Sequence, residues 1–128
     1  MNLSNRPRRL RKTQELRSLV TQTHVHISNL IMPVFIKETI SDAEAIASMP
    51  GIYRQSSKSL IDHCKHIRAL GIPAIALFPS IDPNKKTPTA TEALNPDNIY
   101  YKSIRHIKKE VPELSIISDI ALDPYSSD

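Results

Sequence analysis

The sequence predicts an α/β fold in which strands and helices alternate along the chain. Short apolar runs rich in β-branched residues, at 30–36, 74–78 and 114–119, are typical of buried strands. Amphipathic segments at 57–70 and 96–111 separate these runs and have the spacing of helices. Alternation of this kind builds a parallel sheet with right-handed crossovers.

Such a sheet would be incomplete by itself. Three parallel strands of the buried type leave an edge uncovered and lack helices on one side. The 128 residues suffice for one domain with a core, but this pattern indicates the front part of a larger α/β domain. We divide the chain into an arm with a short helix at 1–28 and the α/β part at 29–128.

Positive charge is concentrated at the amino end of the chain. The net charge is +4, and a single acid, Glu15, faces the cluster formed by Arg6, Arg8, Arg9, Arg11, Lys12 and Arg17. Such a cluster could bind nucleic acid, an anionic membrane or an acidic protein surface. No aromatic residue is interleaved with it, which weakens the nucleic-acid interpretation. We expect neither nucleic acid nor a membrane as partner.

Cysteine content and hydropathy restrict the class of protein further. Cys64 is the only cysteine, which excludes an internal disulfide and a cysteine-built metal site. A reducing compartment fits this, so we expect the cytoplasm or a plastid. No apolar run approaches the length of a membrane span, and the 40% apolar and 23% charged fractions are those of a globular chain.

The first half of the chain contains the weaker structural signals. Thr13 can cap a short helix that carries Leu16, Leu19 and Val20. Pro33 lies within the first apolar run, which predicts an edge strand or an irregular entry. The segment 41–44 matches a Ser-x-x-Glu capping box and predicts a helical turn after it.

The second half contains two clear helices and a long connection. The first helix ends at Gly71, and its apolar stripe consists of Leu60, Ile61, Cys64, Ile67 and Leu70. Asn95 and Pro96 predict the cap and first residue of the second helix. The connection at 80–94 is long enough to indicate a functional or mobile loop, in which Lys85 and Lys86 are either solvated or bind substrate.

Two carboxylates follow the last strand. Asp119 and Asp123 lie four residues apart, and Pro124 cannot continue a central strand. Both acids therefore project from the carboxyl end of the strand, where α/β folds bind their ligands. The alternative is that they only cap a turn, a position where Asp is common.

Six segments together resemble the 5-aminolevulinate dehydratase (porphobilinogen synthase) family, in register over nearly the whole chain. They are RPRRLR at 6–11, LIMPVFI at 30–36, SMPGIYR at 48–54, LGIPAIALFP at 70–79, ALNPD at 93–97 and DIALDPY at 119–125. The resemblance implies that the chain holds the first three βα steps of a (β/α)8 TIM-type barrel. An extended arm would precede the barrel and wrap a neighbouring subunit of a homo-octamer.

The resemblance also implies a reaction. Family members condense two molecules of 5-aminolevulinate into porphobilinogen with loss of water, early in tetrapyrrole and heme biosynthesis. Asp119 would be the active-site acid, and Arg6, Arg8, Arg9 and Arg11 would belong to the oligomer arm. Two Schiff-base lysines of the family come from later strands, and no lysine here falls at a matching position. We therefore expect an amino-terminal fragment of the enzyme that is inactive alone.

The implied metal is magnesium, acting as an allosteric activator through a ligand outside this chain. Zinc-dependent members have cysteines where this chain has Ala121 and Asp123. Thiolates select zinc, whereas a carboxylate favours magnesium, so zinc is not expected and Asp123 is only a weak metal candidate.

Non-catalytic alternatives remain open. The chain could be a truncated paralogue that acts as a binding or subunit-interaction module through its basic arm. It could also be a structural remnant that joins intact subunits through the same arm.

Overall fold

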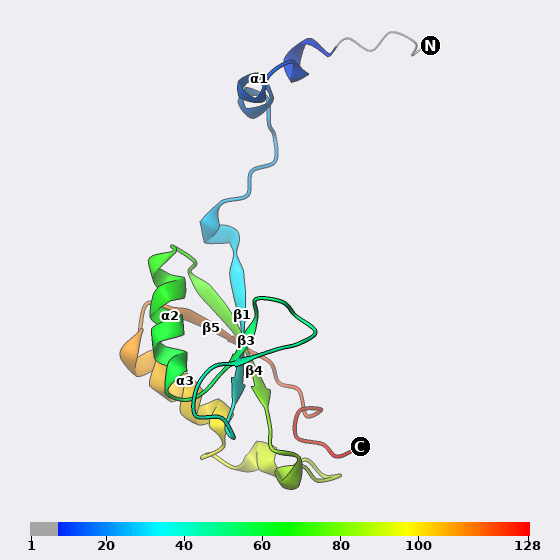
Figure 1. Cartoon of the computed structure of the whole chain (residues 1–128), viewed down its shortest axis with the longest axis vertical. Coiled ribbons are helices and arrows are strands. Elements are labelled where there is room, and N and C mark those ends of the chain that lie inside the picture. The colour runs from blue at the N-terminus through cyan, green and yellow to red at the C-terminus, as the bar shows by residue number, and fades with distance from the viewer. Residues whose placement is uncertain (1–7) are drawn as a thin grey trace.

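The structure is a computed structural model that describes residues 8–128. A slender amino-terminal arm leads into an α/β body, and the two are well separated along the long axis (Figure 1). The arm contains the 3-10 helix η1 (Arg9–Arg11), helix α1 (Gln14–Leu19) and the 3-10 helix η2 (Ile27–Asn29). As predicted, the Thr13 side chain caps α1 by accepting the Leu16 N–H at 3.2 Å. Arg6, assigned to the arm from the sequence, lies outside the described residues.

The body contains five strands, two α-helices and two 3-10 helices. In chain order they are β1 (Ile31–Lys37), β2 (Glu44–Ala45), β3 (Tyr53–Gln55), α2 (Ser59–Ala69), β4 (Ala74–Ser80), η3 (Pro83–Lys85), η4 (Thr91–Leu94), α3 (Ile99–Glu110) and β5 (Ser115–Ser118).

The strands form one sheet in the order β2-β3-β1-β4-β5. β1 is parallel to β3 and β4, and β4 is parallel to β5, while β2 runs antiparallel to β3. The three predicted strands and their parallel pairing are therefore present. Helices α2 and α3 pack side by side on one face of this sheet (Figure 1).

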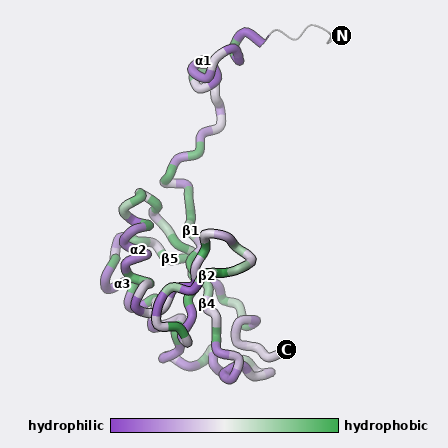
Figure 2. The backbone as a smooth tube through the Cα atoms, viewed as in Figure 1, coloured by the Kyte–Doolittle hydropathy of each residue, from purple (hydrophilic) through white to green (hydrophobic). Residues whose placement is uncertain are grey.

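The core lies between the sheet and these two helices. Val34 and Ile36 of β1 and Ile75 and Leu77 of β4 are at most 1% exposed, and they pack against the apolar sides of α2 and α3 in one cluster. In Figure 2 the tube is green along β1, and α2 and α3 alternate between green and purple. The intervening residues of the same strands face away from the helices, because side chains alternate along a strand.

The structure agrees with the expectation for Pro33 at the proline itself. β1 is central in the sheet, but only Phe35 and Ile36 pair with β3. At Pro33 the strand therefore has a neighbour on one side alone, where Pro33 pairs with Ala76. The helical turn predicted from the capping box at 41–44 was wrong, because the Glu44 side chain bonds to Lys37 and Arg54 and its backbone enters β2.

The predicted cap of α3 at Asn95 and the predicted burial of Leu70 were also wrong, whereas Gly71 ends α2 as predicted. Helix α3 begins after Asn98, whose side chain accepts the Tyr101 N–H at 3.0 Å. Asn95 instead accepts the Asp97 N–H in a local turn. Leu70, predicted on the apolar stripe of α2, is 53% exposed, because the helix ends there and Gly71 turns the chain with a φ of +86°.

Candidate functional site

The carboxyl ends of β1, β4 and β5 meet at one edge of the sheet. The registers Lys37–Ser80 and Leu77–Ser118 place the last residues of neighbouring strands beside one another. In parallel sheets this edge is where ligands bind. Asp119 follows β5 directly, so it stands at this edge as the sequence predicts.

Strand alternation puts Asp119 on the face that the helices do not cover. Ile116 packs against the core, whereas Ile117 is 45% exposed on the opposite face. Asp119 is two residues further and so shares the side of Ile117. On the same face, the rings of Phe35 and Phe78 stack with centroids 5.6 Å apart. The acid therefore ends a row of side chains that would line the inside of a closed barrel.

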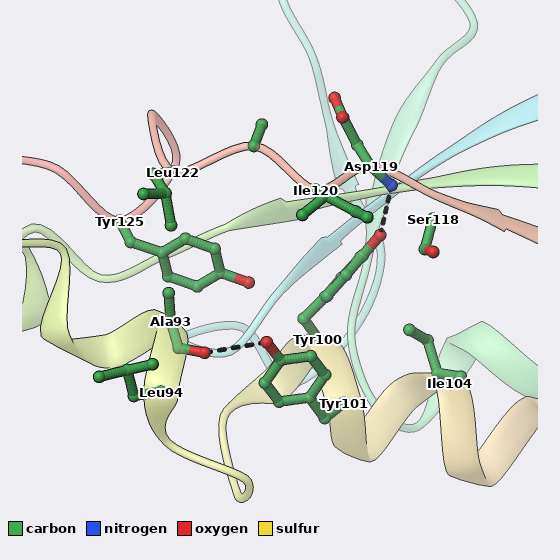
Figure 3. A pocket seen from close by; sticks show the side chains of 11 residues that line it. Ala93, Leu94, Tyr100, Tyr101, Ile104, Ser118, Asp119, Ile120, Leu122 and Tyr125 are labelled. Carbon is green, nitrogen blue, oxygen red and sulfur yellow. Dashed lines mark hydrogen bonds between the residues drawn. The ribbon is translucent and has the colours of Figure 1, made fainter.

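Tyr100 of α3 holds the backbone of Asp119 in place. The Asp119 N–H donates to the Tyr100 hydroxyl at 3.0 Å, and Tyr100 is only 4% exposed. Burial is the main cause that raises the pKa of Tyr100 above its usual value. Figure 3 shows the Asp119 carboxylate pointing away from Tyr100, on the other side of the backbone.

A hollow of about 290 Å³ lies beside this backbone, on the helix side of the segment 118–122. Its walls include Tyr101, Ile104, Leu122 and Tyr125, and burial raises the pKa of Tyr125 to about 12. Tyr101 is held by donating its hydroxyl to the Ala93 carbonyl at 2.9 Å (Figure 3). Because the Asp119 carboxylate points away from these walls, we do not assign this hollow to the chemistry.

The turn-cap alternative for the two acids finds no support in the structure. Among residues 8–128, no group donates a hydrogen bond to the side chain of Asp119 or Asp123. Asp123 lies in the turn before Tyr125 and is exposed.

No metal centre is formed within the described part of the chain. Residues 8–128 bring together no group of three His, Cys, Asp or Glu side chains that could hold an ion. The Ala121 side chain has no atom that could bind a metal, and Cys64 of α2 is fully buried in the core.

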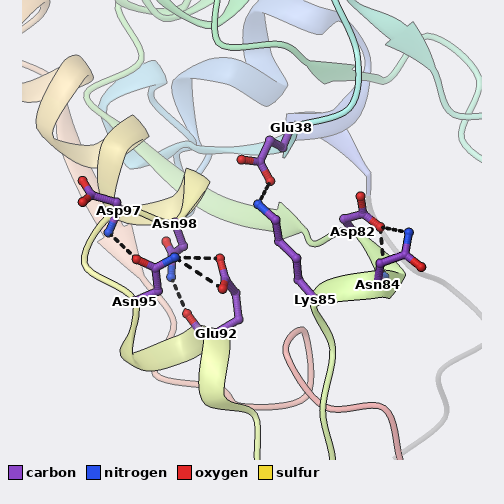
Figure 4. Close-up of polar contacts among 8 residues, drawn as sticks. All are labelled: Glu38, Asp82, Asn84, Lys85, Glu92, Asn95, Asp97 and Asn98. Atoms are coloured by element: carbon purple, nitrogen blue, oxygen red, sulfur yellow. Dashed lines mark hydrogen bonds and ion pairs between the residues drawn. The ribbon is translucent and has the colours of Figure 1, made fainter.

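The lysines of the 80–94 connection have different surroundings. Lys85 pairs with Glu38 in the loop after β1 (Figure 4). Lys86 borders a second hollow at the strand ends, next to Lys37 and Arg54. The connection itself is tied to the chain end by Thr87, whose N–H donates to the Tyr125 carbonyl at 3.3 Å.

The sequence did not point to Tyr100, Lys37 or Arg54. Tyr100 lies on the helix stripe and is indistinguishable there from a core residue. Lys37 and Arg54 are separated by 17 positions, and only the register of β1 with β3 brings them together. Lys37 is the last residue of β1, but Arg54 is the middle residue of β3, so no signal in the sequence marks the two as neighbours.

The arm lies away from this edge. Arg8, Arg9 and Arg11 are exposed, and no helix formed by residues 8–128 is long and apolar enough to cross a membrane.

A parallel sheet with helices on one face, and polar side chains at the carboxyl ends of its strands, is the arrangement of α/β-barrel proteins. Comparison with known families narrows this class. The family model described as delta-aminolevulinic acid dehydratase matches residues 4–128. The chain belongs to this family, and the resemblance derived from its motifs is confirmed.

Individual relatives agree with the family match. The delta-aminolevulinic acid dehydratase of Bradyrhizobium diazoefficiens is 39% identical over 127 residues, which cover 99% of this chain and 36% of the relative. The Chlamydia pneumoniae protein of the same name is 41% identical, with 99% and 38% covered. This chain therefore spans little more than a third of either relative.

A solved structure has the same fold. The porphobilinogen synthase of Toxoplasma gondii, in complex with the reaction product porphobilinogen, matches with a TM-score of 0.89 and 38% identity. The match covers 98% of this chain and 35% of the other. The predicted assignment to the first part of a (β/α)8 barrel is thereby confirmed.

Proposed function

We propose that this chain supplies the first βα steps of a porphobilinogen synthase, which condenses two molecules of 5-aminolevulinate with loss of water. The observation that carries the proposal is the close match to a structure that holds porphobilinogen. The edge of the sheet at which barrels bind their ligands bears Asp119 in this chain.

In this proposal Asp119 acts as an acid–base group of the active site. Its carboxylate ends the row of inward-facing side chains, and in a closed barrel it would face amines contributed by later strands. An opposite charge nearby favours the charged form of each group. A carboxylate there can hold an amine protonated or accept a proton as the imine forms. Tyr100 fixes the backbone from which this carboxylate projects.

We propose magnesium rather than zinc as the metal of the complete enzyme. Support comes from the residues at the positions of the zinc cysteines: Ala121 has no donor atom, and Asp123 is a hard oxygen ligand. Residues 8–128 do not hold a metal by themselves, so no step of the chemistry is derived through one.

We also propose how the protein assembles into an oligomer and in which compartment it is found. Exposed Arg8, Arg9 and Arg11 support an arm that docks on a neighbouring subunit of an octamer. The name of the Chlamydomonas reinhardtii relative, 39% identical, places that protein in the chloroplast. We propose the cytoplasm or a plastid for this protein.

A chimera tests the function. Residues 4–128 replace the matching segment of the Bradyrhizobium diazoefficiens relative, and porphobilinogen formation from 5-aminolevulinate is measured. We expect turnover by the chimera and none by the isolated chain, which carries no Schiff-base lysine. A chimera that assembles to the size of the relative but makes no porphobilinogen would contradict the proposal and favour a non-catalytic paralogue.

A further inference from the structure

A second hollow, separate from the one beside Tyr100, opens at the carboxyl ends of β1, β3 and β4. Its volume is about 400 Å³, within the usual range of small-molecule sites. Lys37, Arg54, Ser80 and Lys86 contribute to its walls. Lys37 and Ser80 are register partners, and Arg54 pairs with Phe35 on the other side of β1. All three strands therefore direct polar side chains to the same place.

The basic side chains of this hollow already converge on one carboxylate. The Lys37 ammonium contacts both Glu44 oxygens, at 3.0 Å and 2.9 Å, and Arg54 Nη1 contacts Oε1 at 3.1 Å. These contacts lower the pKa of Glu44, chiefly through the hydrogen bond from Lys37. The site thus shows the geometry of a carboxylate held by a lysine and an arginine.

The element that brings Glu44 here is the shortest strand of the sheet. β2 has two residues and pairs only with the three-residue β3. Few backbone bonds therefore retain Glu44, and its side chain is 39% exposed. Its displacement breaks two partly exposed ion pairs, which are weak interactions in water.

Charge in the hollow favours an incoming anion. Three positive charges, on Lys37, Arg54 and Lys86, and two negative charges, on Glu44 and Asp82, give the hollow and its contacts a net charge of +1. The Asp82 carboxylate is engaged within its own loop, where it accepts from Asn84 (Figure 4). In the part of the chain from residue 8 onward, no carboxylate lies within 4.0 Å of the Lys86 ammonium.

We propose that this hollow binds the carboxylate of a small organic acid, which takes the place of Glu44 between Lys37 and Arg54 and contacts Lys86. The acid would be of the substrate class, a keto acid such as 5-aminolevulinate, and that identity rests on the proposed function. The binding site itself requires no catalysis.

The test is a titration of the isotope-labelled 128-residue chain followed by amide NMR. The probes are levulinate, which is the keto acid without the amine, 5-aminolevulinate, the uncharged methyl ester of levulinate, and inorganic phosphate. We expect both keto acids to shift the amides of residues 37, 54 and 86 in a saturable manner, and the ester to leave them unchanged.

Variants with opposite expectations sharpen this test. Lys86→Gln removes one attractive charge and should weaken levulinate binding about fivefold. Glu44→Gln removes the competing carboxylate and should strengthen binding by a similar factor. Lys65→Gln is the matched control, because it makes the same change at an exposed position of α2 outside the hollow. A dispersed spectrum shows that each variant is folded.

Three results would overturn the proposal: shifts that do not saturate, equal effects of Lys86→Gln and Lys65→Gln, or phosphate binding as tightly as levulinate at the same amides. The last result would make the hollow a general anion site. Because the titration needs no turnover, its failure leaves the chimera result standing, and an inactive chimera leaves the titration standing.

Discussion

Asp119 is the side chain on which the proposed chemistry depends most. In the chimera, Asp119→Asn keeps the shape of the side chain and removes its charge. We expect turnover to fall at least about a hundredfold, the lower end of general acid–base effects, with the assembly intact. Steady-state rates and size-exclusion chromatography measure the two quantities.

The matched control for Asp119→Asn is Asp62→Asn, the same change at an exposed position of α2. It should change turnover much less, since α2 packs on the opposite face of the sheet from the row that ends at Asp119. Equal activity of the Asp119 variant and the unmodified chimera would reduce Asp119 to a turn residue.

Ala121 and Asp123 together predict the response to metals. Because neither Ala121 nor Asp123 supplies a thiolate for zinc, we expect a zinc-selective chelator to leave the activity of the chimera unchanged. Addition of magnesium should raise activity. Loss of activity on chelation, followed by recovery with zinc alone, would contradict this expectation.

Cys64 is shielded twice from chemical modification. It is fully buried against the sheet, and burial raises the pKa of its thiol to about 11. Because the thiolate is the reactive form, the folded chain should react with iodoacetamide far more slowly at neutral pH than the chain in urea. Similar rates in the two states would show that the core around α2 opens readily.

Among the elements, helix α3 has the most specific start. Asn98 is 1% exposed, accepts the Tyr101 N–H and donates to the Glu92 carbonyl at 3.0 Å (Figure 4). Asn98→Ala removes both bonds and should lower the free energy of unfolding by about 2 kcal/mol. Urea denaturation of the chain measures this.

Asn95→Ala provides the comparison, because the sequence pattern favours Asn95 as the cap. The Asn95 side chain accepts the Asp97 N–H at 2.9 Å and donates to the Glu92 carboxylate at 3.2 Å. Both bonds are local and neither caps the helix, so their loss should cost about 0.5 kcal/mol. If Asn95→Ala proved the more damaging of the two changes, the helix would begin where the sequence suggested.

The elements also show which features sequence patterns can predict. β1, β4, β5 and the two long helices were predictable, since each has a sustained apolar period. β2 and β3 have two and three residues, too few for any period. Glu44 shows the physical reason for the error at 41–44: its local capping pattern lost to ion pairs with residues 7 and 10 positions away.

Contacts between residues far apart in the sequence also limited what could be predicted of the site. The position of Asp119 at the end of β5 could be predicted, because an apolar run precedes it and a proline follows it nearby. The Tyr100 contact spans 19 positions, and the Lys37–Arg54 pair depends on strand register. Neither is encoded in a local pattern, so neither could be read from the sequence.

At the scale of the whole molecule, the arm stands apart from the α/β body (Figure 1). Exchange of Arg8, Arg9 and Arg11 for glutamine in the chimera should therefore leave the body folded and reduce the size of the assembly. Analytical ultracentrifugation measures that size, and circular dichroism reports the fold. An assembly of unchanged size would show that these arginines play no part in subunit contacts.

The strand order β2-β3-β1-β4-β5 has a consequence for how the chain acquires its fold during synthesis. Ile31 pairs with Ala74, which is 43 residues later in the chain. At ribosomal rates of about 5–20 residues per second, β4, which pairs with β1 over its full length, is synthesised roughly 2–9 s after β1. During that interval the apolar side chains of β1 depend on the exit tunnel or a chaperone for shielding, and pauses in translation between the codons for β1 and β4 would prolong the exposure.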